Sequence, residues 1–131
     1  MLKESPLPRY FDLFSLDIDS YDYWIWRSLQ DYRPTIVVVE YNPFFAPTEA
    51  KTLPLNLATE WPYFGASPAA LESLGRAKDY RLVGYTSGLN LFFVLEQFAR
   101  GLFERLPVRC VPTEPHDVRQ QWTQWDRFVD V

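Results

Sequence analysis

The chain has 131 residues, about the length of one domain, and its 47% hydrophobic and 18% aromatic residues exclude a disordered protein. A net charge of −4 without a basic run argues against a nucleic-acid partner, and the lone cysteine, Cys110, excludes an internal disulfide. The start "MLKESPLPRYF" lacks a signal-peptide core, and no apolar run approaches the roughly 20 residues that cross a bilayer, so we expect a cytoplasmic protein without a membrane partner.

The first predicted element is a buried strand from Tyr10 to Ile18, "YFDLFSLDI". The prolines ahead of it make residues 1–9 an N-terminal lead. A helix of about three turns is predicted from Ser20, which can cap it, to a stop before Pro34. Residues at helical spacing predict its apolar face: Tyr21, Ile25, Ser28, Leu29 and Tyr32.

A second strand is predicted from Thr35 to Pro43, "TIVVVEYNP". Its successive apolar residues, without alternation, are typical of a strand covered on both faces. Strand, helix and strand in this order form a parallel crossover unit and predict an α/β fold. Residues 44–66 carry several prolines and aromatic residues, which predicts a long loop that serves either as a binding lid or as packing.

The following segment predicts a helix capped by Ser67, with Pro68 in its first turn and an apolar face of Ala70, Leu71, Leu74 and Ala77. Two strands in "RLVGYTSGLNLFFVLEQF" are predicted to form a hairpin through Thr86, Ser87 and Gly88, and a third helix to run from about Glu96 to Arg105. The domain is thus expected to span residues 10–106. Residues 107–131 are predicted to be a docked, partly helical tail with a stripe of Trp122, Trp125 and Phe128.

Acidic residues follow both parallel strands, where ligands bind in open α/β sheets. Asp17, Asp19 and Asp22 follow the first strand, and Glu40 and Asn42 end the second. Neighbouring strands lie about 5 Å apart, so these carboxylates are expected to converge and to raise one another's pKa. The structural alternative is that Asp19 or Ser20 caps the helix, Asp22 interacts with its dipole and Asn42 shapes a turn. Asp17 and Glu40 fit that alternative least, because each interrupts an apolar strand.

Other chemistries find little support in the sequence. His116 lies in a proline-flanked stretch, and the chain has no nucleophile elbow, Walker pattern or GxGxxG motif. A carboxylate-rich metal-dependent hydrolase is disfavoured because only one histidine is present. Cys110 is expected to be an unreactive thiol.

Three segments in order, "LFSLDIDSYDYWIWRSL", "RPTIVVVEYNP" and "FGASPAALESLGRAKDYRLVGYTSGLNLFFV", resemble the carboxyl-terminal half of FkbM-like S-adenosylmethionine-dependent methyltransferases. The resemblance covers residues from about Phe11 to Val94. Asp17, Asp19 and Asp22 match an acidic "D-I-D-G-x-D" motif in which Ser20 replaces the usual glycine. Glu40, Tyr41 and Asn42 match the family's "E-Y-N" segment.

The resemblance implies part of a Rossmann-like methyltransferase sheet, strands four to seven with the last two antiparallel, flanked by helices. It implies catalytic roles for Asp17, Asp19, Asp22 and Glu40, as a base or as holders of a divalent metal that activates an acceptor hydroxyl. Tyr41, Asn42 and Asn90 would bind the acceptor, a small molecule or a sugar. The glycine-rich cradle for S-adenosylmethionine has no counterpart in this chain, which leaves the cofactor-binding residues unknown.

Two hypotheses follow from this missing cradle. The chain is either the acceptor-side half of an O- or N-methyltransferase, inactive in isolation, or a non-catalytic methyltransferase-like module that oligomerises. The strand from Tyr10 to Ile18 lacks a sequence partner on one edge and has no lysine or proline within it. A second copy of the chain, or a complementary chain with the missing half, is expected to pair there.

Overall fold

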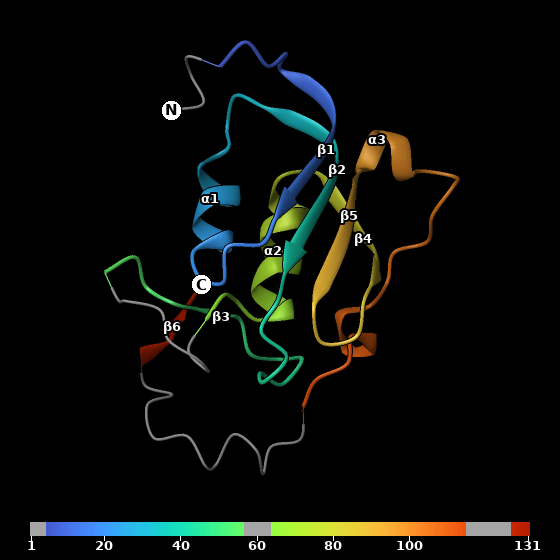
Figure 1. Cartoon of the computed structure of the whole chain (residues 1–131). Coiled ribbons are helices and arrows are strands. Elements are labelled where there is room, and N and C mark those ends of the chain that lie inside the picture. Colours follow the sequence, from blue (N-terminus) through green and yellow to red (C-terminus); the bar gives the residue numbers. More distant parts are fainter. Residues whose placement is uncertain (1–4, 57–63, 115–126) are drawn as a thin grey trace.

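A four-stranded mixed sheet is the centre of the fold (Figure 1). The structure is a computed structural model and describes residues 5–56, 64–114 and 127–131. The strands lie in the order β1 (Tyr10–Leu16), β2 (Arg33–Glu40), β5 (Asn90–Leu95) and β4 (Tyr80–Tyr85). β1 is parallel to β2, whereas β2 and β5, and β5 and β4, are antiparallel. The prediction of a mixed α/β protein with one parallel crossover and a terminal hairpin is confirmed.

Helices α1 (Asp22–Ser28) and α2 (Pro68–Ala77) lie behind the sheet in Figure 1 and cover the same face. α2 begins as predicted, because the Ser67 hydroxyl accepts a hydrogen bond of 3.1 Å from the Ala70 N–H and Pro68 occupies the first turn. Ala70, Leu71 and Leu74 are buried, but Ala77 is exposed at the last turn, so the predicted apolar face ends one turn early.

The two helices and the sheet pack together around Gly75 of α2. Trp26 of α1 is fully buried and packs against the rings of Phe93 and Tyr80, with centroid distances of 4.8 Å and 5.7 Å. A Cβ atom on Gly75 of α2 would lie 2.7 Å from the Phe93 ring and 3.0 Å from the Trp26 ring. The missing side chain therefore lets α2 approach the sheet closely enough to enclose the tryptophan.

Four predicted details of the helices differ from the structure. α1 has seven residues instead of about three turns. It buries Tyr23 and Trp26, whereas of the predicted face only Leu29, just after the helix, is buried. Ser20 is not the cap, since its hydroxyl donates to the Ile18 carbonyl at 3.0 Å in the turn before the helix. α3 (Glu96–Ala99) ends six residues before Arg105, because Arg100 has extended backbone and Gly101 has φ +81°.

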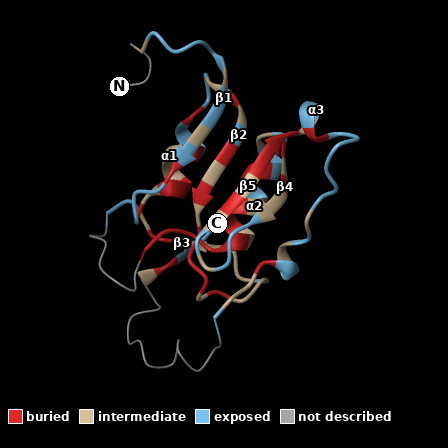
Figure 2. Ribbon diagram, turned by 45° about the vertical axis from the view of Figure 1, so that its right-hand side comes forward, coloured by how far each residue is buried: buried red, intermediate tan, exposed pale blue. Residues whose placement is uncertain are grey.

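The prediction that the second strand is covered on both faces is also wrong. Val37 and Val39 are fully buried beneath the helices, but Ile36 on the opposite face is 36% exposed. Leu13, its neighbour on β1, is 56% exposed. Figure 2 shows the resulting contrast between the largely exposed β1 and the largely buried β5. Helices α1 and α2 both lie on one face of the sheet, and Leu13 and Ile36 are exposed on the other.

The loop after β2 contacts the end of the chain. β3 (Lys51–Thr52) pairs with β6 (Val129–Asp130), and the ring of Phe128 packs edge-on against Phe45 at 4.7 Å. A short 3-10 helix, Val108–Cys110, precedes the second gap. Trp122, Trp125 and His116 lie outside the described residues, as do residues 57–63 of the predicted loop. None of the described helices has the length and apolar character needed to cross a membrane.

Replacing Gly75 by alanine tests the close helix packing. Alanine normally stabilises a helix interior relative to glycine, but here its Cβ forces the Phe93 and Trp26 rings apart. We expect Gly75→Ala to lower the free energy of unfolding by about 1–3 kcal/mol in urea denaturation. Gly84→Ala is the matched control, because the nearest atom to its new Cβ is at an ordinary 3.9 Å. An equal or smaller loss for Gly75→Ala than for Gly84→Ala would contradict the packing.

Candidate functional site

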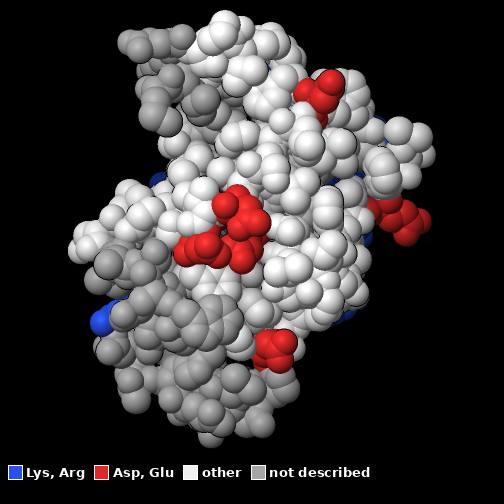
Figure 3. Space-filling model, viewed as in Figure 1, with Lys and Arg blue, Asp and Glu red and all other residues white. Residues whose placement is uncertain are grey.

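Parallel pairing brings the ends of β1 and β2 to one level. The last paired residues are Leu16 and Val39, so Asp17 and Glu40 follow them side by side. Asp17, Asp19 and Glu40 each offer an oxygen atom, and these atoms lie within 4.8 Å of one another. We call these three residues the acidic rim. Figure 3 shows an acidic patch over these strand ends, with no lysine or arginine atoms adjoining it in this view.

Asp22 is not part of the acidic rim, but its hydrogen bonds hold the turn that carries Asp19. It is fully buried, and its carboxylate accepts hydrogen bonds from the N–H groups of Ile18 at 3.3 Å and Ser20 at 3.2 Å. Burial raises the pKa of Asp22, although these backbone bonds oppose the rise. Asp22 thereby fixes the turn in which Asp19 adopts the left-handed conformation, φ +56°, that aspartate tolerates better than most residues.

Glu40 is the least solvated carboxylate of the rim. Its Oε2 atom is inaccessible to solvent and has no hydrogen-bond partner among the described residues. Burial, and then the charges of Asp19, Asp17 and Asp22, raise the pKa of Glu40 to about 7. Glu40 therefore changes its charge near neutral pH and can accept a proton or a hydrogen bond from a bound molecule.

Asn90 lies directly across from Glu40 in the antiparallel register of β2 and β5. Residues that face each other in this way project side chains from the same face, with Cβ atoms about 4.5–5.5 Å apart. The Thr86 N–H donates to the Asn90 carbonyl at 2.8 Å, and the Asn90 N–H donates to the Thr86 hydroxyl at 3.0 Å, which holds Asn90 at the start of its strand. The topology thus adds an amide beside the three carboxylates.

The side chains of Tyr41 and Asn42 make hydrogen bonds to other parts of the chain. The Tyr41 hydroxyl accepts from the Gly88 N–H at 2.8 Å and donates to the Pro112 carbonyl at 3.2 Å, and burial raises its pKa. The Asn42 amide donates to the Phe64 carbonyl and accepts from the Phe44 N–H, both at 2.9 Å. Both residues are fully buried, so their visible role is to hold the hairpin turn and the loop after β2.

The acidic rim offers the oxygen ligands that a divalent cation prefers. S-adenosylmethionine fits less well. The loop after β1 contains no glycine, and the long connection from β2 to α2 contains one, Gly65, just before α2. The other four glycines lie in α2, in β4, in the hairpin turn and after α3, so no glycine-rich loop follows either parallel strand. The chain therefore does not form the donor cradle that the resemblance implies, and no step through the donor is assigned to it.

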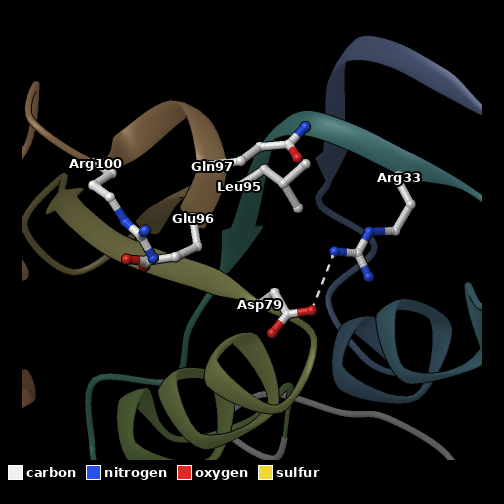
Figure 4. A pocket seen from close by; sticks show the side chains of 6 residues that line it. All are labelled: Arg33, Asp79, Leu95, Glu96, Gln97 and Arg100. Carbon is white, nitrogen blue, oxygen red and sulfur yellow. Dashed lines mark hydrogen bonds and ion pairs between the residues drawn. The ribbon is translucent and has the colours of Figure 1, made fainter.

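A pocket of about 390 Å³ lies at the opposite end of the sheet (Figure 4). It is lined by Arg33, Asp79, Leu95, Glu96, Gln97 and Arg100. Arg33 reaches the Asp79 carboxylate at 3.4 Å, and Figure 4 shows Arg100 beside Glu96, so positive and negative groups are balanced. No local sequence pattern predicts this pocket, because Arg33 and Asp79 lie 46 positions apart in the chain. It shares no residue with the acidic rim.

Comparisons of this chain with known proteins found no matching family model, no matching curated protein and no matching solved structure.

The titration of Glu40 predicts how stability varies with pH. A carboxyl group with a pKa near 7 in the folded chain and 4.5 when unfolded binds more protons in the fold between these values. The contribution of Glu40 to stability is therefore present in full below about pH 4.5 and is lost as pH rises through about 7. The loss should be on the order of 1–3 kcal/mol after allowance for solvent screening.

Glu40→Gln should remove this loss and raise the free energy of unfolding at pH 8, measured by urea denaturation at several pH values. Asp12→Asn, an exposed change on the same sheet, is the control. A carboxyl resonance of Glu40 that titrates near 4.5 by NMR would contradict the prediction.

Proposed function

We propose that this chain is the acceptor-side half of an S-adenosylmethionine-dependent methyltransferase, in which the acidic rim holds a hydroxyl or amine of a small molecule or sugar and Glu40 takes its proton. One observation carries the proposal. Glu40 presents a buried oxygen without a partner among the described residues, at the carboxyl end of a parallel strand and beside two further carboxylates.

The topology supports the same function. The resemblance implies two parallel strands followed by an antiparallel pair, and the order β1-β2-β5-β4 has this form. It also implies that the sheet continues beyond its first strand, and β1 is an edge strand. A complementary chain or segment that carries the donor site would add there, and a cytoplasmic location is part of this proposal.

Each residue of the site has a separate role in the proposed reaction. An acceptor O–H or N–H donates a hydrogen bond to Glu40 and passes its proton to that carboxylate as the acceptor becomes nucleophilic. Asp17 and Asp19 bind a neighbouring donor group and orient the acceptor, and Asn90 supplies both a donor and an acceptor. A base with a pKa of about 7 suits this step at neutral pH, because its charged form is available and still basic.

Binding of a model acceptor tests the site in the isolated chain. D-glucosamine carries hydroxyls and a cationic amine, and we expect it to shift the amide NMR signals of Asp17, Asp19, Glu40 and Asn90. Glucose 6-phosphate should bind at least tenfold more weakly, because three carboxylates repel its phosphate. Shifts confined to the Arg33 pocket, or unchanged in an Asp17→Asn, Asp19→Asn variant, would refute the site.

Methyl transfer tests the reaction itself. S-adenosylmethionine should give no calorimetric binding to this chain alone. Radiolabelled methyl transfer should appear once the segment or chain encoded immediately upstream is added, and Glu40→Gln should slow it by about 10²–10⁴-fold. Tight donor binding by the isolated chain, or transfer that is indifferent to Glu40, would overturn the proposal.

A divalent metal is the second means by which the rim would activate an acceptor. Mn²⁺ should then broaden the NMR signals around Asp17, Asp19 and Glu40, and Asp17→Asn should abolish the effect, whereas Asp12→Asn should not. Equal broadening in both variants would exclude a specific site.

A non-catalytic, oligomerising module is the second candidate function. The observation that favours it is the β1 edge, which is largely exposed and has no partner strand among the described residues, and which can take up a further strand without any chemistry.

A further inference from the structure

The two outer edges of the sheet differ in their protection. At the β4 edge the Leu106 N–H donates to the Leu82 carbonyl at 2.8 Å, and Arg81 binds the Phe103 carbonyl. The chain segment around residues 103–106 thus covers that edge. β1, at the other edge, has no partner beyond β2 among the described residues, although it is seven residues long and lacks lysine, glycine and proline.

The hydrogen-bond pattern shows which groups of β1 are free. The Arg9 carbonyl accepts from the Arg33 N–H at 2.7 Å, so Arg9 and alternate residues after it direct their backbone toward β2. The backbone groups of Tyr10, Asp12, Phe14 and Leu16 therefore point away from the sheet. These four residues form a template for a further strand.

We propose that this edge pairs antiparallel with β1 of a second copy, around a two-fold axis perpendicular to the sheet at Leu13. Such an axis makes the same patch serve on both subunits. Tyr10 then exchanges hydrogen bonds with the partner's Leu16, and Asp12 with the partner's Phe14. Leu13 faces the partner's Leu13 in the closer, non-hydrogen-bonded type of pair. The pairing joins two sheets of four strands into one of eight.

Electrostatic interactions between the two strands favour this register over its neighbours. The register places Arg9 opposite the partner's Asp17, and Asp17 opposite the partner's Arg9, on the same face as Leu13. An axis at Asp12 would place two aspartates directly opposite each other, which is unfavourable. An axis at Phe14 would need Asp19 to continue the strand to meet the partner's Arg9, but its φ of +56° ends the strand there.

The dimer also covers surface that is exposed in the single chain. Tyr10 is 60% exposed and Leu13 is 56% exposed, and both lie along the shared edge. In addition, the partner's Arg9 approaches Asp17, a member of the acidic rim. The second copy thereby contributes a cation to the site, and this inference stands whether or not the proposed methyl transfer is correct.

Sedimentation equilibrium of the full chain tests the association. We expect a particle of twice the 15.5 kDa chain mass. Arg9→Glu should raise the dimer dissociation constant about tenfold or more, because each dimer exchanges two attractive pairs for two repulsive ones. Arg9→Glu combined with Asp17→Arg should restore dimerisation. Arg109→Glu, an exposed change of equal charge outside the edge, should leave it unchanged.

Disulfide cross-linking tests the register. With the exposed Cys110 replaced by serine, Leu13→Cys should form a disulfide-linked dimer under mild oxidation, since non-hydrogen-bonded partners have Cα atoms about 4.5 Å apart. Ser15→Cys lies on the same face but opposite the partner's Phe11, and it should not cross-link.

A monomer at all concentrations would refute the proposal and leave the edge free for another chain. A dimer that is indifferent to Arg9→Glu, or cross-linked equally well through residues 13 and 15, would place the interface elsewhere and refute it too.

Discussion

The parallel register of β1 and β2 is the constraint on which the acidic rim and the open edge both depend. The pairs stay in step from Tyr10 and Arg33 to Leu16 and Val39, so two segments of the chain end at the same level. A slip of one residue would turn Glu40 to the face covered by the helices and expose Val37 and Val39 instead. The helix between the strands holds the register, because Trp26 is enclosed between Gly75 and Phe93 and cannot shift without opening the core.

The burial of Glu40 beside two other carboxylates is energetically unfavourable, and a ligand can reduce this cost. Its buried oxygen lacks a partner among the described residues, and its neighbours at the rim carry the same charge. Asp19 adds backbone strain in the left-handed region. Burial and repulsion at the same point favour any group that brings a proton, a hydrogen-bond donor or a positive charge. The cation of an amine, the hydroxyl of an acceptor and a divalent metal all meet that requirement, whereas an anion does not. Burial and negative charge at the acidic rim therefore define the class of ligand, whereas they do not distinguish one reaction from another.

Local interactions explain what the sequence predicted correctly, and distant ones explain what it missed. Ser67 and Pro68 start a helix through contacts within one turn, and Gly88 with φ +73° closes a hairpin in the same way. The buried face of α1 depends on Gly75 and Phe93, which lie far along the chain, so helical spacing alone did not predict the burial of Tyr23 and Trp26. Exposure of Ile36 depends on both helices lying on one face, which strand composition does not encode. The convergence of Asp17 with Glu40 was predictable from topology, but the buried position of Asp22 and the hydrogen bonds that engage Tyr41 and Asn42 needed coordinates.

In the described part of the chain β1 has one edge without a partner strand, and that edge can hold only one of the two proposed partners. A strand of the donor half would bind the outward N–H and C=O groups of Tyr10, Asp12, Phe14 and Leu16, and the second copy in the proposed dimer uses the same groups. One strand can satisfy them only once, so self-association and completion of a methyltransferase sheet exclude each other. The two arrangements also differ at the rim, because only the dimer brings the partner's Arg9 to Asp17 and so opposes the binding of a further cation. A donor half would have to displace a copy that both covers the edge and neutralises part of the site. If both proposals hold, the strength of the dimer sets the concentration of donor half needed to complete the proposed enzyme, and the seven residues of β1 govern both assembly and access to the acidic rim.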